Sequence, residues 1–241
     1  MTMPRSVRVG LTLSVGFFWV MGAFLAIVMA IFVLISAGAA LLGGVDASMW
    51  QNAGSGAFKY FPMAMGIMLT PVLLPIYVAQ GVTRRQFTVG GALFVAVWSA
   101  GLTLAMVAGF AVEAVAYDAL GWPHELENPH LFDSWQQAHL VFAEYFPLIA
   151  VHMLAGWIIG MTYYVLGWFR ATLLLPVSLL PALAAEVLLA TSWIGSALRE
   201  FTEYTPPSAG VGVTGALLVS AAAWAALYLI VRDMPIKLGA A

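Results

Sequence analysis

Six long apolar runs, almost free of charged residues, constrain this chain more than any other feature of its sequence. They cover approximately residues 11–42, 61–79, 88–115, 141–168, 171–194 and 211–231. An α-helix rises about 1.5 Å per residue, so each run can cross a hydrocarbon core of about 30 Å. The sequence therefore predicts an all-α, polytopic membrane protein, with one transmembrane domain over residues 1–241 and six spans.

The composition supports this class and excludes others. Charged residues make up 8% of the chain, against about 25% in soluble domains. Cysteine is absent, which excludes disulfide scaffolds, thiolate metal sites and cysteine nucleophiles. The chain has neither a basic tract for nucleic acid nor a GxxxxGK[ST] motif for phosphate. We expect no nucleic-acid partner and no nucleotide hydrolysis in this chain. The sequence also has no HExxH motif, no cysteine nucleophile and no serine–histidine spacing typical of intramembrane proteases, so we do not expect an enzyme.

The basic residues are distributed unevenly over the connections between the runs. With a cytoplasmic N-terminus, the inner segments hold Arg5, Arg8, Arg84, Arg85, Arg170, Arg232 and Lys237, and the outer ones hold Lys59 and Arg199. Lys and Arg concentrate in cytoplasmic loops of membrane proteins. This bias predicts that both the N- and the C-terminus are cytoplasmic.

The stretch GVTRRQF, residues 81–87, places two adjacent arginines in a short inner connection. One interpretation is a topology anchor, because arginines hold short loops on the cytoplasmic side. The other is a docking site, because guanidinium groups bind carboxylates on a partner through paired hydrogen bonds. The residues of the stretch alone leave both interpretations open.

Two segments resemble the type-2 ABC exporter permeases, especially small actinobacterial ones. FPMAMGIMLTPVLLPIYVAQGVTRRQF, residues 61–87, looks like their second span and following loop, and GWFRATLLLPVSLLPAL, residues 167–183, is similar to their turn into span five. The resemblance implies a multi-pass permease subunit in a bacterial cytoplasmic membrane. It would form a homodimer, or a heterodimer with a similar permease. A separate ATP-binding subunit would bind the ATP and Mg.

In that family, the loop between spans two and three forms a short coupling helix that docks on the ATP-binding subunit. The matching residues here are Gly81, Val82, Thr83, Arg84, Arg85, Gln86 and Phe87. The resemblance implies that Thr83 caps this helix and that the arginines bind acidic groups of the partner. It also implies that Phe87 fills an apolar pocket of the partner.

Four ionisable side chains lie within the predicted spans. Glu186 and His152 are deep and at similar depth, whereas Glu113 and Glu144 lie near the outer ends and are expected to be interfacial carboxylates. Ionisable groups inside a membrane are costly and often functional. Glu186 and His152 can form a point on a translocation path or a proton relay, or a buried contact that fixes helix packing. A proton-coupled secondary carrier using these two residues is therefore the alternative to the exporter.

Prolines and glycines predict bends and close contacts. Span two carries Pro71 and Pro75, and span five carries Pro176 and Pro181, and these four are expected to kink their helices. Gly156 and Gly160 form a GxxxG pattern in span four, which permits close approach of another helix.

The polar connection over residues 117–140 contains three histidines, His124, His130 and His139, together with several carboxylates. Their spacings match no compact metal-binding motif. We therefore expect no metal site and no cofactor in this chain.

Overall fold

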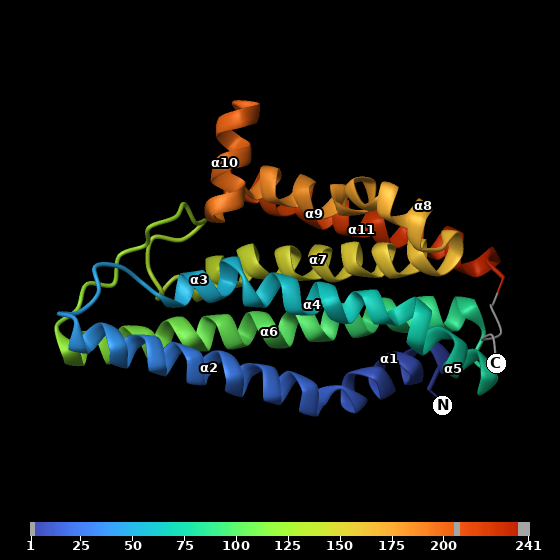
Figure 1. The fold of residues 1–241 in the computed structure, drawn as a ribbon, viewed down its shortest axis with the longest axis horizontal. Coiled ribbons are helices and arrows are strands. Elements are labelled where there is room, and N and C mark those ends of the chain that lie inside the picture. Colours follow the sequence, from blue (N-terminus) through green and yellow to red (C-terminus); the bar gives the residue numbers. More distant parts are fainter. Residues whose placement is uncertain (1–2, 205–207, 236–241) are drawn as a thin grey trace.

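The computed structural model describes residues 3–204 and 208–235, and within these ranges all regular secondary structure is helical (Figure 1). The elements are α1 (Arg5–Gly16), α2 (Phe18–Leu41), α3 (Trp50–Ser55), α4 (Ala57–Met68), the π-helical turn η1 (Leu69–Leu73), α5 (Leu74–Ala79), α6 (Arg84–Leu120), α7 (Ala138–Leu166), α8 (Trp168–Leu173), α9 (Leu175–Leu189), α10 (Ser192–Thr202) and α11 (Ala209–Asp233). They form six segments that are long and apolar enough to cross a membrane, which confirms the predicted all-α fold and the predicted number of candidate spans.

The six segments run alternately up and down in one bundle (Figure 1). Helix α7 lies at its centre and is packed by α4, α6, α9 and α11. At one end, called here the turn end, α1 begins, α5 turns into α6, α7 turns into α8, and α11 ends. The opposite end, called the loop end, carries the long connection over residues 121–137 (Figure 1). The basic residue Lys237 lies outside the described residues.

Glycines bring α4 and α7 into backbone contact. A Cβ atom added to Gly156 would overlap the carbonyl oxygen of Met63, and one added to Gly160 would overlap that of Ile67. Gly66 on α4 meets the backbone of α7 in the same way. The close helix contact predicted from Gly156 and Gly160 is therefore confirmed, with α4 as the partner helix.

The second span begins at Trp50, and the predicted start at residue 61 was wrong. The segment before residue 61 contains polar and small residues that resemble a loop, but the small ones are used for packing. A Cβ at Gly54, for example, would lie 2.5 Å from the hydroxyl oxygen of Tyr145. As a consequence Lys59 is fully buried inside the span, and its assignment to an outer loop was also wrong.

The four prolines expected to bend spans two and five have different positions. Pro71 lies in the π-helical turn η1 and Pro181 lies inside α9. Pro176 lies in the first turn of α9, where a proline removes no helical hydrogen bond, so it begins that helix instead of kinking it. Pro75 lies just after η1, inside the helical segment that continues from α4 into α5.

The first and fifth spans also differ from their predicted limits. The first begins at Arg5 and is divided into α1 and α2 at Phe17. Helix α1 packs closely against α6, since a Cβ atom added to Gly10 would lie 2.7 Å from the Gly90 carbonyl oxygen. The fifth ends at Leu189, and the predicted end at residue 194 was too late. Ala190 has φ of 53°, and α10 then leaves the bundle at a steep angle (Figure 1).

Candidate functional site

The GVTRRQF stretch forms the end of a tight turn and the first turn of α6. Gly81 has φ of 81°, in the left-handed region that favours glycine. The Thr83 hydroxyl accepts a hydrogen bond from the Gln86 amide at 3.2 Å, and the Gln86 side chain accepts one from the Thr83 amide at 3.1 Å. This capping box starts a helix of 37 residues. In this turn, all of which the structure describes, there is no separate short helix of the kind that we expected. Thr83 instead caps α6, which forms a whole span.

Arginines from two spans line a recess at the turn end. Its wall consists of Val78, Gly81, Val82, Thr83, Arg84, Arg85 and Arg232, around a volume of about 450 Å³. Arg85 is exposed and Arg84 half-buried. Arg232, from α11, pairs with its neighbour Asp233 at 2.7 Å. We call this feature the arginine recess; its exposed guanidinium groups are suited to binding carboxylates or other anions.

The two arginines of α6 do not stabilise the helix that carries them. The N-terminus of an α-helix carries a partial positive charge, so cations in the first turn are disfavoured there. Arg84 and Arg85 occupy this first turn. Helix stability therefore does not explain why two arginines occur at this position. The explanation is either the membrane topology of the chain or the binding of a partner.

Phe87 is not available to a partner. It is fully buried, and its ring packs against Tyr77 at 5.5 Å and against Trp157 at 6.2 Å between ring centroids. The expectation that Phe87 fills a pocket on another subunit was therefore wrong. The residue instead ties the first turn of α6 to α5 and to the central helix α7.

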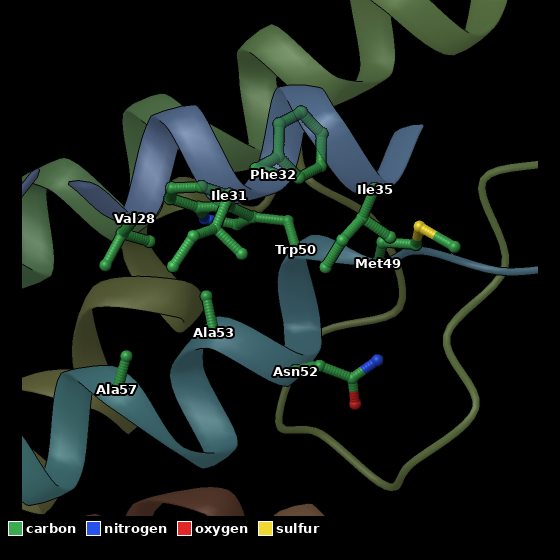
Figure 2. Close-up of a pocket in the computed structure, with 9 residues that line it drawn as sticks. All are labelled: Val28, Ile31, Phe32, Ile35, Met49, Trp50, Asn52, Ala53 and Ala57. Carbon is green, nitrogen blue, oxygen red and sulfur yellow. The ribbon is translucent and has the colours of Figure 1, made fainter. Parts of the chain in front are cut away.

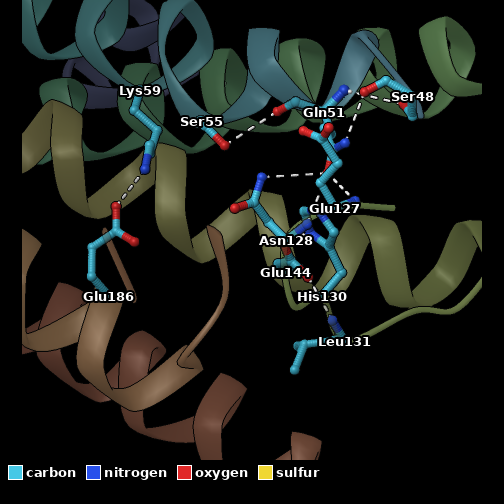
Figure 3. A network of polar contacts seen from close by, with 10 residues as sticks. All are labelled: Ser48, Gln51, Ser55, Lys59, Glu127, Asn128, His130, Leu131, Glu144 and Glu186. Carbon is cyan, nitrogen blue, oxygen red and sulfur yellow. Dashed lines mark hydrogen bonds and ion pairs between the residues drawn. The ribbon is translucent and has the colours of Figure 1, made fainter. Parts of the chain in front are cut away.

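Glu186 and His152 come together in the bundle with a third residue, Lys59 (Figure 3 shows the ion pair of Glu186 with Lys59). The Lys59 Nζ atom lies 2.6 Å from Glu186 Oε1, and the His152 Nε2 atom lies 3.6 Å from the same oxygen. All three side chains are buried and come from α4, α9 and α7. Sequence reasoning missed Lys59, although a deep carboxylate such as Glu186 is a signal that a cation lies nearby.

A cavity of about 130 Å³ adjoins this intramembrane cluster. It is lined by Tyr60, Met63, His152, Leu179, Ala182, Leu183, Glu186 and Ile194. Its polar residues are Tyr60, His152 and Glu186, and the rest of its wall is apolar. Tyr60 and Leu183 are 46% and 40% exposed, so the cavity opens on the outer surface of the bundle.

Glu113 joins α6 to the start of the second span. It is fully buried and accepts hydrogen bonds from the Ser48 hydroxyl at 2.5 Å and from the Trp50 amide at 2.7 Å. His124 Nε2 lies 3.0 Å from the same carboxylate. Glu113 was expected to be an interfacial, water-accessible carboxylate, but it is a buried anchor.

Glu144 and Gln51 hold the connection over residues 121–137 in place (Figure 3). Glu144, also buried instead of interfacial, lies 2.8 Å from His130 Nδ1 and accepts a hydrogen bond from the Leu131 amide at 2.7 Å. Gln51 Oε1 accepts hydrogen bonds from the amides of Glu127 and Asn128 at 3.1 and 3.2 Å. Within the described ranges, no three His, Asp or Glu side chains gather in a way that could hold a metal ion.

A second cavity, between α2 and the start of span two, is apolar (Figure 2). It has a volume of about 230 Å³ and is lined by Val28, Ile31, Phe32, Ile35, Met49, Trp50, Asn52, Ala53 and Ala57. The Trp50 indole N–H is already bonded to the Met106 carbonyl oxygen at 3.1 Å. Since this cavity brings no ionisable groups together, the arginine recess and the Glu186 cluster are the two candidate functional sites.

Comparisons with known protein families, with functionally characterised proteins and with solved structures find no match for this chain.

Proposed function

We propose that this chain is the transmembrane permease subunit of an ATP-driven exporter of the type-2 ABC class, and that a separate ATP-binding subunit docks at the arginine recess. The proposal rests on the arginine recess. There Arg84 and Arg85 occupy the first turn of α6, the end of a helix at which a positive charge is unfavourable. Carboxylates on a docked subunit would give them the partners that their own helix does not. The resemblance of residues 61–87 to exporter permeases supports the same assignment.

The geometry of α6 suits the transmission of movement from such a partner. The helix runs without a break from Arg84 at the turn end to Leu120 at the loop end. Its first turn is fixed by the capping box of Thr83 and by burial of Phe87. A displacement applied at Arg84 and Arg85 is therefore carried along the whole span to Glu113. Two permease chains, identical or similar, would form the translocation path, and the ATP-binding subunits would hold ATP and Mg.

Co-purification tests the docking. We would isolate the tagged protein from its native membrane in mild detergent, after crosslinking, and identify the proteins that accompany it. The wild type is expected to bring an ATP-binding subunit, and Arg85→Glu is expected to lose most of it, because a carboxylate then faces the carboxylates of the partner.

Arg170→Glu is the matched control. Arg170 is an exposed arginine on α8, also at the turn end but outside the recess. It is expected to retain the partner and to insert normally. An intact complex in Arg84→Glu/Arg85→Glu, or the absence of any ATP-binding subunit from the wild-type sample, would contradict the docking proposal and leave the arginines as topology anchors.

A proton-coupled carrier is the second candidate, and the Lys59–Glu186–His152 cluster is the observation that favours it. Such a carrier would take up protons through the cluster without any ATPase. The test is proton uptake into proteoliposomes that contain this chain alone, driven by a pH gradient. Uptake that is present in the wild type and lost in Glu186→Gln, in samples where that variant is still folded, would favour the carrier over the exporter.

A further inference from the structure

The exposed face of α1 carries two arginines followed by an apolar stripe. Arg5 and Arg8 are both exposed, and within residues 3–204 and 208–235 neither forms an ion pair with an acidic side chain. Residues three and four apart share one face of a helix, so Leu11 and Val15, which are also exposed, continue the same face further into the span. The opposite face of α1 is buried against α6.

The break at Phe17 opens a groove beside this stripe. Helices α1 and α2 meet there at an angle (Figure 1), and a groove of about 490 Å³ lies between their junction and α6. Its lining includes Leu11 and Val15 of α1, Trp19 of α2 and Val97 of α6. A rise of about 1.5 Å per residue makes the groove roughly 12 Å long from Leu11 to Trp19. It therefore runs along the span, with the arginines beyond its Leu11 end.

The two ends of the groove lie at different depths in a membrane. Arg8 precedes Leu11 by about one helical turn, roughly 5 Å. The headgroup region of a bilayer is about 5–8 Å thick on each side of a hydrocarbon core of about 30 Å. Since the apolar run begins directly after Arg8, the arginines lie at headgroup depth and the groove lies in the hydrocarbon. The hydroxyl of Ser14 is already bonded to the Gly10 carbonyl oxygen at 2.9 Å, so the groove is suited to an apolar occupant.

A phospholipid has both of the parts that this arrangement fits. One leaflet is half of the hydrocarbon core, about 15 Å, so a groove of roughly 12 Å takes most of one acyl chain. Guanidinium groups bind phosphate through paired, charge-assisted hydrogen bonds. Two arginines without acidic partners favour a lipid with a net negative charge, because a zwitterionic lipid brings a further cation beside them.

We propose that this groove holds one acyl chain of an anionic phospholipid from the surrounding bilayer, and that Arg5 and Arg8 bind its phosphate. The site is separate from the arginine recess, because neither of these residues lines that recess. The lipid site goes beyond the proposed docking of an ATP-binding subunit. It does not depend on that docking, since lipid binding is a property of this chain alone.

Native mass spectrometry tests the headgroup contact. The full chain is released from detergent micelles that contain equal amounts of phosphatidylglycerol and phosphatidylcholine with identical acyl chains. The wild type is expected to retain one phosphatidylglycerol, with a preference of roughly tenfold or more over phosphatidylcholine. Arg5→Gln/Arg8→Gln is expected to lose this preference. Arg170→Gln, which removes an exposed arginine of α8 at the same end of the bundle, is the matched control and should keep it.

A groove-filling variant tests the position of the acyl chain. Val97→Trp is expected to abolish retention of phosphatidylglycerol, because the larger side chain occupies the groove. Val112→Trp is the matched control, because Val112 is an exposed valine of the same helix that does not line the groove. It is expected to retain the lipid as the wild type does. Both valines are exposed, so both variants are expected to fold.

Each of the opposite results overturns the proposal. Equal retention of the two lipids, or of neither, would mean that the arginines select no headgroup. Loss of the preference in Arg84→Gln/Arg85→Gln, but not in Arg5→Gln/Arg8→Gln, would place the lipid at the arginine recess. Retention that survives Val97→Trp would place the acyl chain outside the groove. None of these results depends on whether an ATP-binding subunit co-purifies, so the two proposals fail separately.

Discussion

Lys59 Nζ lies 2.6 Å from Glu186 Oε1, although 127 residues separate the two along the chain, and neither side chain is exposed beyond 1%. Helices α4 and α9 both pack on α7. The ion pair joins the two directly and brings His152 of α7 into contact with the same carboxylate. Three of the six spans therefore meet at one point inside the membrane.

The first prediction concerns the stability of this pair. Glu186→Gln is expected to destabilise the protein by about 3–5 kcal/mol, because it removes the ion-pair partner of a buried ammonium group. The double variant Lys59→Met/Glu186→Gln is expected to recover much of this loss, since both charges are then gone. Thermal unfolding of the single and double variants in mild detergent measures the coupling. Strictly additive losses would show that the two residues do not act as a pair.

The second prediction concerns the contact of α4 with α7. Gly160→Ala is expected to lower the melting temperature clearly, because the added methyl group overlaps the Ile67 carbonyl oxygen and backbone cannot rotate away. Gly22→Ala in α2 is the control, since nothing lies within 4 Å of its added Cβ. It is expected to leave stability unchanged or to raise it by about 0.5–1 kcal/mol. Equal effects of the two substitutions would contradict backbone contact at Gly160.

The third prediction concerns the capping box of α6. Thr83→Ala is expected to cost about 1 kcal/mol locally, because the Gln86 amide loses its acceptor. Hydrogen exchange at the amide of Gln86 should become faster, whereas Thr83→Ser should keep the wild-type rate. The same exchange rate in wild type and Thr83→Ala would mean that the cap does not hold the first turn.

The fourth prediction concerns the connection over residues 121–137. Glu144→Met removes the acceptor of the Leu131 amide and the partner of His130, a loss of about 1–3 kcal/mol for buried groups. The connection should then be cleaved faster in limited proteolysis. Glu125→Met is the control, because the Glu125 side chain is exposed. Equal cleavage rates of the two variants would show that Glu144 does not anchor this segment.

The number of spans, the fold class and the close packing at Gly156 and Gly160 could all be predicted from the sequence. Each depends on a local property. Hydrophobic length determines whether a helix can cross a bilayer, and glycine spacing determines whether a helix surface is flat enough for backbone contact. The capping role of Thr83 was also readable, because a cap and its partner lie within one helical turn.

The tertiary structure decided the rest. Lys59 looked like a loop residue because the stretch just before it, QNAGSG (residues 51–56), consists of small and polar residues. Only the packing of α3 and α4 against the bundle places Lys59 in a span. Phe87 looked like an exposed anchor until α5 and α7 covered it. Glu113 and Glu144 became buried because a distant segment folds over each of them and supplies donors. The sequence determined which segments are apolar enough to enter the membrane, because that property belongs to each segment alone. The partner of each buried charged residue depends on which helices become neighbours, and only the tertiary structure decides that.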